Sequence, residues 1–187
     1  MFASLLAAVL LTAAPAPLDV VKSGNTEVQK IITAKGGTAE QLSKTVDRFV
    51  DWGELSKRAL GETWDKLTPA QRTDFSETMQ GLLRASYAQR ALSQGRALVQ
   101  YGQQSIQGNE ATVGTKVIMS RDRLPVQYKL FRAAGKDEWR IYDIVTDDIS
   151  LLETYQGQFR KIMADKGFNG LLTTLKAKRA QLEKSLE

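Results

Sequence analysis

The sequence contains no cysteine and no histidine among its 187 residues. The absence of cysteine excludes disulfide bonds, thiolate metal sites and thiol nucleophiles. The absence of histidine removes the most common general base and the most common metal ligand of proteins. Catalysis would have to rely on carboxylates, Lys, Tyr or Ser. The composition therefore favours binding over chemistry, and we predict no catalytic residue, no metal site and no cofactor.

Clustered positive charge is also missing. The 26 Lys and Arg residues are spread along the chain without a basic run or an aromatic RNA-binding signature, which argues against a nucleic-acid partner. The net charge of +5 suits an anionic partner such as a lipid headgroup, a membrane surface or an acidic protein, although a solvated basic surface gives the same value. With 42% hydrophobic and 25% charged residues, the chain has the composition of a folded soluble domain.

The sequence begins with MFASLLAAVLLTAAPAP, an apolar core of about 10 residues followed by small residues. Such a core is too short to span a bilayer and resembles the hydrophobic region of a secretory signal peptide. We expect residues 1–16 to be a signal-like segment and residues 17–187 to be one domain. No Lys or Arg precedes the core, and proline follows both Ala14 and Ala16, so an uncleaved anchor or a buried helix is the alternative.

Helical periodicity dominates the first half of the chain. It predicts helices over residues 17–34, 38–50 and 52–60. The clearest helix start is LTPAQ, where Thr68 can cap, Pro69 occupies the first helical position and Gln71 can complete a capping box. The helix that follows carries a broad apolar stripe to about residue 92. The stripe consists of Phe75, Met79, Leu82, Leu83 and Tyr87.

After Gly95 the apolar period changes to two, which indicates strands. Four strands are predicted, over residues 97–107, 111–120, 124–134 and 138–146. The short connections between them imply an antiparallel meander. In the last strand we expect Trp139, Ile141, Asp143 and Val145 to share one face and Tyr142 and Ile144 the other.

A helical pattern returns after the strands. Ser150 and Glu153 form an S-x-x-E capping box, and we expect Gly167 to end the helix that it starts. A last amphipathic helix carries several leucines. Helices on one face of a curved, four-stranded antiparallel sheet make an α+β fold. The space between the concave face and the helices is either a filled core or an apolar pocket, and periodicity alone does not separate the two.

Three stretches resemble the MlaC family: LGETWDKLTPAQRTDF (60–75), WRIYDIVTDDISLLETYQGQF (139–159) and KGFNGLL (166–172). These are periplasmic phospholipid-binding proteins of the Mla intermembrane transport system, also called toluene-tolerance or ABC-transporter auxiliary proteins. The positions that match the family pattern are Leu60, Gly61, Trp64, Pro69, Gln71, Phe75, Trp139, Tyr142, Asp143, Ser150, Leu151, Tyr155, Gln158, Phe159 and Gly167. Two places depart from it, since the family often has Glu-Gly at Asp148-Ile149 and usually Arg at Gln156.

The resemblance implies a nuclear-transport-factor-like core with helical additions and an apolar cavity between sheet and helices. It implies a soluble, non-enzymatic phospholipid carrier in the periplasm of a Gram-negative bacterium, which serves outer-membrane lipid asymmetry. Its implied partners are phospholipid, an outer-membrane lipoprotein complex, and an inner-membrane ABC-transporter complex with a substrate-binding subunit. The chain contains no P-loop, so any nucleotide chemistry belongs to a partner.

The residues expected to contact lipid are those on the inward faces of the predicted strands and helices. They are Phe75, Met79, Leu82, Val117, Met119, Val126, Tyr128, Leu130, Trp139, Ile141, Val145, Phe159 and Ile162. Trp64 and Trp139 are interpreted first as packing anchors, with stacking on a ligand as the alternative. The nearby cations Lys129, Arg132 and Arg140 would either meet lipid phosphates or form a wet face.

Two alternative functions are open at this point. Asp143 could be the general base of a small pocket enzyme, as in ketosteroid-isomerase-like enzymes of the same broad fold, or a carboxylate hydrogen-bonded to a neighbouring turn or Tyr. Asp147 and Asp148 could bind a metal ion or serve turn formation and the helix dipole. The other alternative is a non-catalytic periplasmic interaction module with a filled core.

Overall fold

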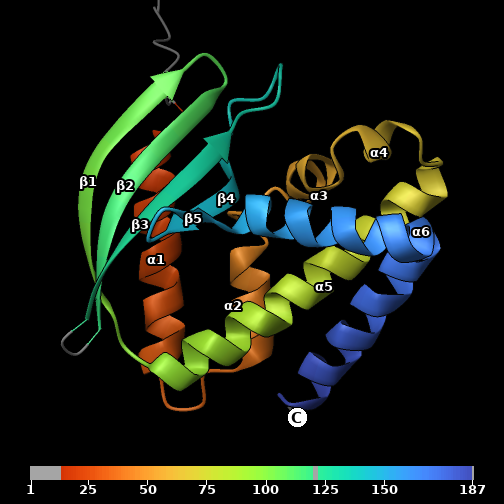
Figure 1. The fold of residues 1–187 in the computed structure, drawn as a ribbon. Helices are drawn as coiled ribbons and strands as arrows, with labels where there is room; N and C mark the ends of the chain where they lie inside the picture. The colour runs from red at the N-terminus through yellow and green to blue at the C-terminus, as the bar shows by residue number, and fades with distance from the viewer. Residues whose placement is uncertain (1–13, 120–121, 187) are drawn as a thin grey trace, which may run out of the picture.

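The computed structural model describes residues 14–119 and 122–186 (Figure 1). Most of the signal-like segment expected at 1–16 therefore lies outside the described residues. The helices before the sheet are α1 (Pro17–Thr33), α2 (Ala39–Val46), α3 (Trp52–Leu60), α4 (Glu62–Asp65) and α5 (Pro69–Gln94). The strands are β1 (Leu98–Gln107), β2 (Glu110–Met119), β3 (Asp122–Phe131), β4 (Arg140–Thr146) and β5 (Ile149–Ser150), and α6 (Leu151–Lys184) follows them. Among the described residues, no helix has the length and apolarity needed to cross a membrane.

Side-chain caps start the long helices at the predicted residues. The hydroxyl of Thr68 accepts a hydrogen bond from the Gln71 N–H at 3.3 Å, and the Gln71 side chain accepts one from the Thr68 N–H at 2.9 Å. At the start of α6, the hydroxyl of Ser150 accepts a hydrogen bond from the Glu153 N–H at 3.0 Å. These bonds satisfy N–H groups that have no partner within the helix. Both predicted helix starts are confirmed.

The sheet is antiparallel with the strand order β1-β2-β3-β4-β5, so the prediction of four strands is wrong by one. The additional strand, β5, has two residues and pairs with the end of β4. The turn between them is Asp147-Asp148, and both residues have a positive φ, 48° and 62°. Aspartate tolerates this left-handed conformation better than most residues, which permits a tight hairpin. The sequence pattern predicted the helix start at this place but did not predict the hairpin before it.

A β-bulge between β3 and β4 changes which residues of β4 share a face. Leu130 pairs with Ile141, whereas the neighbouring Lys129 pairs with Asp143, so Tyr142 is the extra residue. Ile141 and Asp143 therefore lie on opposite faces of the sheet. The prediction that they share a face is wrong because strict alternation fails wherever a strand bulges.

Helix α6 changes direction at Gly167, whose backbone has a left-handed φ of 65° (Figure 1). Glycine adopts this conformation at little cost, so the break predicted at this residue is confirmed. Beyond it the helix continues and turns back along α5. Both parts of α6 therefore contact α5, through Phe159 and Phe75 in the first part and through Lys176 and Asp74 in the second, and the start of the first part bonds β4.

The helices and the sheet form two sides of one apolar core. Helix α1 packs on β1 and β2, while α3 and α6 pack on β4. Figure 1 shows the sheet curving along one side of the molecule, with α5 and α6 crossing beside it. The largest fully buried side chains include Phe75, Phe159, Leu42, Met79, Leu82 and Leu130. They come from α2, α5, β3 and α6, so the core depends on contacts between distant parts of the chain.

Candidate functional site

The inner face of the sheet carries apolar residues in register. Leu130 of β3 lies between Ala111 of β2 and Ile141 of β4, and all of them are buried. Farther along the same face, Val126 pairs with Thr115, whose hydroxyl donates a hydrogen bond to the Val126 carbonyl at 2.9 Å. This face forms one wall of the interior, and α1, α5 and α6 stand opposite it.

Most of the residues expected to contact lipid come together between the sheet and the helices. They either belong to one apolar cluster or pack against it. These residues are Phe75, Met79, Leu82, Tyr128, Leu130, Trp139, Ile141, Phe159 and Ile162. The structure therefore places side chains from α5, β3, β4 and α6, and the loop before β4, around a common interior.

The other expected residues lie outside that cluster. Val117 and Met119 are half-buried near the end of β2, and Val126 is buried close to them. Val145 pairs with Gln127, which puts it on the outer face of the sheet because of the bulge. The inner face is therefore packed near β4 and more open near the turn between β2 and β3.

Aromatic side chains connect the surface of α6 with the core. The ring of Tyr155, which is half-buried, lies 5.4 Å from the ring of Phe159. Phe159 meets Phe75 edge to face at 5.8 Å, and Phe75 also contacts Phe168 at 6.1 Å. Such edge-on and tilted pairs are favourable beyond their buried area. They give a continuous row of aromatic rings from the half-buried surface of α6 to the buried second turn of α5.

Phenol and amide groups mark the border of this interior. Burial raises the pKa of Tyr128 and the pKa of Tyr87, so both hydroxyls remain protonated near neutral pH. The Tyr128 hydroxyl donates a hydrogen bond to the Asn25 side chain at 3.3 Å. Among the described residues, the buried Asn25 Nδ2 has no acceptor, which costs about 1–3 kcal/mol for a buried donor. The interior therefore has a hydrogen-bonding edge next to α1.

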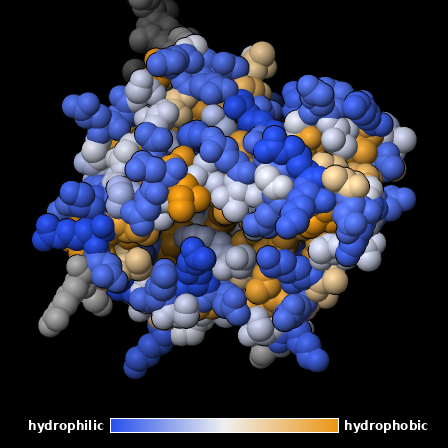
Figure 2. Space-filling view, viewed as in Figure 1, coloured by the Kyte–Doolittle hydropathy of each residue, from blue (hydrophilic) through white to orange (hydrophobic). Residues whose placement is uncertain are grey.

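One face of the molecule is hollowed beside this interior. Figure 2 shows the hollow between the positions of β5 and α5 in Figure 1, with hydrophobic residues at its edges. Ile149 of β5 is 65% exposed, and Leu151 at the start of α6 is also exposed. Large exposed apolar side chains beside a hollow are typical of a binding surface.

Asp143 occupies a structural position. Its side chain is buried, and its carboxylate accepts hydrogen bonds from the Ser150 hydroxyl at 2.7 Å and the Leu152 N–H at 3.0 Å. Lys129 lies 3.2 Å from the same carboxylate. Both oxygens are thus engaged in fixing β4 to the start of α6. The interpretation as a carboxylate hydrogen-bonded to a neighbouring turn is confirmed, and the geometry gives no support to a general base.

The acidic pair Asp147-Asp148 forms the exposed turn between β4 and β5. Within residues 14–119 and 122–186, no group of three or more His, Cys, Asp or Glu side chains is placed to hold a metal ion. The turn interpretation of this pair is confirmed.

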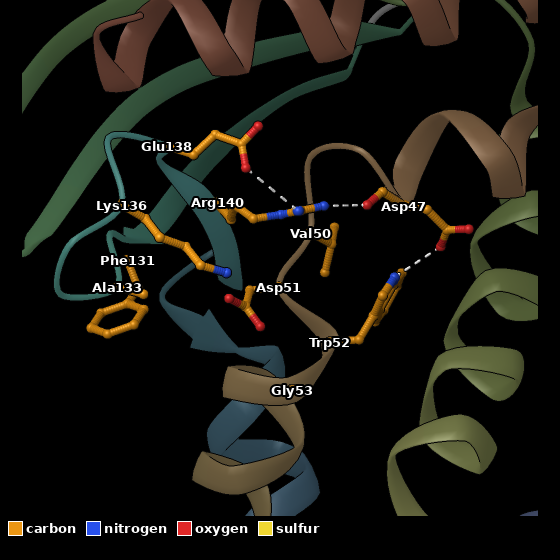
Figure 3. Close-up of a pocket in the computed structure, with 10 residues that line it drawn as sticks. All are labelled: Asp47, Val50, Asp51, Trp52, Gly53, Phe131, Ala133, Lys136, Glu138 and Arg140. Atoms are coloured by element: carbon orange, nitrogen blue, oxygen red, sulfur yellow. Dashed lines mark hydrogen bonds and ion pairs between the residues drawn. The ribbon is translucent and has the colours of Figure 1, made fainter. Parts of the chain in front are cut away.

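A separate pocket of about 310 Å³ lies where the segment between α2 and α3 meets the segment between β3 and β4 (Figure 3). It is lined by Asp47, Val50, Asp51, Trp52, Gly53, Phe131, Ala133, Lys136, Glu138 and Arg140. Arg140 donates a hydrogen bond to the Asp47 carbonyl and lies 3.7 Å from the Glu138 carboxylate. The Asp47 carboxylate pairs with Arg84 and accepts a hydrogen bond from the Trp52 indole at 2.8 Å.

Three charges of this pocket have an ion-pair partner: Arg140 pairs with Glu138 of the same lining, and Asp47 pairs with Arg84 of α5, which lies outside the lining. Asp51 has a further structural role, because it accepts a hydrogen bond from the Glu54 N–H at 2.9 Å and caps α3. The pocket joins two connecting segments, and its polar lining does not suit hydrocarbon. The three cations that were considered as phosphate contacts all have protein partners. Lys129 pairs with Asp143, Arg132 lies over the ring of Trp139 at 4.8 Å, and Arg140 donates a hydrogen bond to the Asp47 carbonyl.

Three residues at the border of the interior were missed by sequence reasoning. Tyr87 and Tyr155 occur in apolar helical stripes, so their spacing identified the correct helix faces, but periodicity does not say which stripe positions reach an opening. Asn25 carries no sequence signal, because a single polar residue in a helix is usually solvated. Its position was not predictable from the sequence.

Comparison with known proteins agrees with this geometry. Residues 18–177 match the family described as "MlaC protein". The Haemophilus influenzae protein named "Intermembrane phospholipid transport system binding protein MlaC" is 25% identical over 144 residues. This match covers 71% of the present chain and 64% of the length of that relative.

A solved structure has the same fold. It is the phospholipid-binding protein from Ralstonia solanacearum in complex with a phospholipid, with a TM-score of 0.78 and 23% sequence identity. The match covers 88% of the present chain and 97% of that protein. Because the family match extends over most of the sequence, from α1 to the last part of α6, the chain belongs to the MlaC family.

Proposed function

We propose that this protein is a soluble carrier that binds a two-tailed phospholipid between its sheet and its helices. The observation that carries the proposal is the interior bounded by the inner sheet face and by α5 and α6, next to a hollowed surface (Figure 2). Family membership supports it, as do the names of the H. influenzae relative and the R. solanacearum protein, which bind or transport phospholipid. Asp143, engaged in structural hydrogen bonds, gives an enzyme little support.

In this proposal the sheet and its helices form a nuclear-transport-factor-like core. Residues 17–187 act as one lipid-binding domain, and residues 1–16 direct export to the periplasm of a Gram-negative bacterium. The interior widens into an apolar cavity when tails enter. The side chains around it would supply hydrocarbon contacts, and the phenols and amide at its border would lie near the polar part of the lipid.

Energetics fit a carrier that does not act alone. Two acyl chains of roughly 16 carbons, at about 0.8 kcal/mol per buried methylene, gain on the order of 25 kcal/mol relative to water. Relative to a bilayer the gain is near zero, because the tails are already buried there. Transfer is then reversible, and its direction must come from partners.

The partners that fit this role are complexes at the two membranes. One is an outer-membrane lipoprotein complex, and the other is an inner-membrane ABC-transporter complex with a substrate-binding subunit. Such a path would maintain the lipid asymmetry of the outer membrane. The net charge of +5 would favour encounter with acidic partners or anionic lipid surfaces.

A vesicle extraction assay tests the proposal. The purified protein is incubated with phosphatidylethanolamine and phosphatidylglycerol vesicles that contain a trace of fluorescent-tailed phospholipid, and the vesicles are then removed by flotation. We expect the protein fraction to retain lipid, approaching one molecule per chain, while heat-denatured protein retains none in soluble form. Absence of lipid from the folded protein fraction contradicts the proposal.

A further inference from the structure

Helix α1 carries a polar side chain, Asn25, among the apolar residues of its inward face. Asn25 follows Val21 by four residues and precedes Val28 by three, so the three side chains lie on one side of the helix. Val21 and Val28 are buried, at 1% and 7% exposed. A polar group at such a position lowers stability unless it is hydrogen-bonded. Asn25 therefore needs partners that its neighbours on α1 do not supply.

The amide of Asn25 is paired through its oxygen and not through its nitrogen. The oxygen accepts the hydrogen bond from the Tyr128 hydroxyl at 3.3 Å. The nitrogen is shielded from solvent and has no acceptor within residues 14–119 and 122–186. Because the phenol holds the oxygen, the amide nitrogen remains as a buried donor next to the inner face of the sheet.

The buried apolar packing of the described residues divides at the level of Asn25. Val21 belongs to the larger apolar cluster, together with Phe75, whereas Val28 belongs to a smaller cluster with Leu42. Viewed as in Figure 1, α1 stands behind the region between β5 and α5, and Figure 2 shows that the surface is hollowed there. The free donor is therefore on a helix that backs the hollow, between two separately packed groups of side chains.

Tyr128 places this donor at the boundary between the packed and the more open part of the inner sheet face. Side chains alternate along β3, so Tyr128 lies between Leu130, which is buried in the larger cluster, and Val126. Beyond Val126 the same face continues to Leu124, which is half-buried. A hydrocarbon tail on the open part of this face would therefore have one end close to Asn25.

A phospholipid offers an acceptor that suits a buried donor among apolar side chains. Its ester carbonyl oxygens are bonded directly to the hydrocarbon tails, whereas its phosphate oxygens are charged and lie farther from them. An ester carbonyl can satisfy the amide nitrogen without the removal of a charge from water, which is far more costly than the burial of a neutral polar group.

We propose that the amide nitrogen of Asn25 donates a hydrogen bond to an ester carbonyl of the bound phospholipid. Tyr128 acts as a positioning residue, since its hydroxyl orients the amide. The inference rests on the proposed function, and it names the residue that recognises the ester linkage and sets how deeply the tails enter.

The test compares a phosphatidylglycerol that has ester-linked tails with its analogue that has ether-linked tails of the same length and lacks both carbonyl oxygens. Vesicles containing equal amounts of the two lipids are incubated with the protein, and the ratio of ester to ether lipid in the protein fraction is measured by mass spectrometry. We expect this ratio to be about five- to tenfold higher for the wild type than for Asn25→Leu, as for the loss of one hydrogen bond to a buried donor. Tyr128→Phe should give an intermediate ratio.

Two more variants complete the comparison. Asn169→Leu changes an exposed asparagine of α6 and should keep the wild-type ratio. Asn25→Ala removes the same donor with a smaller side chain and should lower the ratio as Asn25→Leu does, so the test does not depend on one variant that folds. Thermal melting of the lipid-free Asn25→Leu protein should change little, because the unpaired amide is replaced by an unpaired Tyr128 hydroxyl.

The outcomes separate this inference from the carrier function. If a folded Asn25 variant binds lipid with the wild-type ratio, the ester contact is wrong and the carrier function stands. If Asn169→Leu lowers the ratio as far as Asn25→Leu, the preference does not come from Asn25, and the inference is again overturned. A wild type that takes up neither lipid defeats both proposals.

Discussion

The inner face of the sheet is used differently at its two ends. At the packed end, Leu130 and Ile141 are buried in the same apolar cluster as Phe75. At the open end, near the turn between β2 and β3, Val117, Met119 and Leu124 are half-buried. Among the described residues, none of these three belongs to either apolar cluster.

The difference comes from the helices, because both ends have the same alternating sequence pattern. Helices α3 and α6 pack on β4, and β4 pairs with β3 from Val126 to Phe131, so Leu124 lies beyond the strand on which these helices pack. A fully covered strand gives stability, and a partly covered one leaves apolar surface that another molecule can bury. We infer that the packed end holds the fold and that the open end belongs to the ligand.

The largest expected effect on the free energy of unfolding comes from a substitution at the packed end. Leu130→Glu places an unpaired carboxylate among buried apolar side chains and should destabilise the fold by more than about 4 kcal/mol. Gln127→Glu, on the outer face of the same strand, is the matched control and should change stability by less than about 0.5 kcal/mol. Chemical denaturation monitored by circular dichroism checks both. Near-equal stability of the two variants would show that this end of the interior is not packed.

A smaller loss of stability is expected at Asp143, which fixes β4 to the start of α6. Asp143→Asn removes the charge that faces Lys129 and weakens two hydrogen bonds, which should lower the free energy of unfolding by about 2 kcal/mol. Asp148→Asn keeps a residue that tolerates the positive φ of the turn and should have almost no effect. Urea titration of both variants gives the comparison. A stable Asp143→Asn variant that loses an enzymatic activity would revive the catalytic alternative.

A substitution at the open end should change the amount of retained lipid more than it changes the stability of the fold. Val117→Glu introduces charge into the half-buried inner face and should reduce retained lipid at least about threefold, at a stability cost of about 1 kcal/mol. Its control is Ile118→Glu, because the adjacent residue points to the outer face. Lipid extraction followed by mass spectrometry measures retention. Equal retention in the two variants would mean that the open end does not contact the lipid.

The smallest effect on stability concerns Arg58 and Glu110, a half-buried charge pair that links α3 to β2. The hydrogen bond from Arg58 lowers the pKa of Glu110 below its ordinary value of 4.5. A lowered folded-state pKa contributes stability above the unfolded-state value, and that contribution is lost as the pH falls through the folded-state value. Thermal melts should therefore show a small advantage of the wild type over Glu110→Gln at about pH 6 that shrinks towards about pH 3. If the difference in melting temperature between the two proteins stays constant over this pH range, the effect comes from packing and not from the charge of Glu110.

Sequence reasoning predicted the element order, the helix starts at Thr68 and Ser150, and the break at Gly167, because each depends on local chemistry. It failed where tertiary pairing decides the outcome. The bulge at Tyr142 reversed the face of Asp143 and Val145, and the hairpin through Asp147-Asp148 added a strand. For the candidate site, apolar periodicity identified most of the residues that line the interior. It did not predict the division into packed and open ends, because helix coverage is set by packing between distant segments.

The most direct test of this account is a crystal structure of the protein purified from the bacterial envelope without detergent. We predict one phospholipid whose tails lie between the inner face of β2 and β3 and helices α5 and α6, in contact with Val117 at the open end. An interior packed without lipid, or lipid bound only at the polar pocket lined by Asp51 and Arg140, would contradict it.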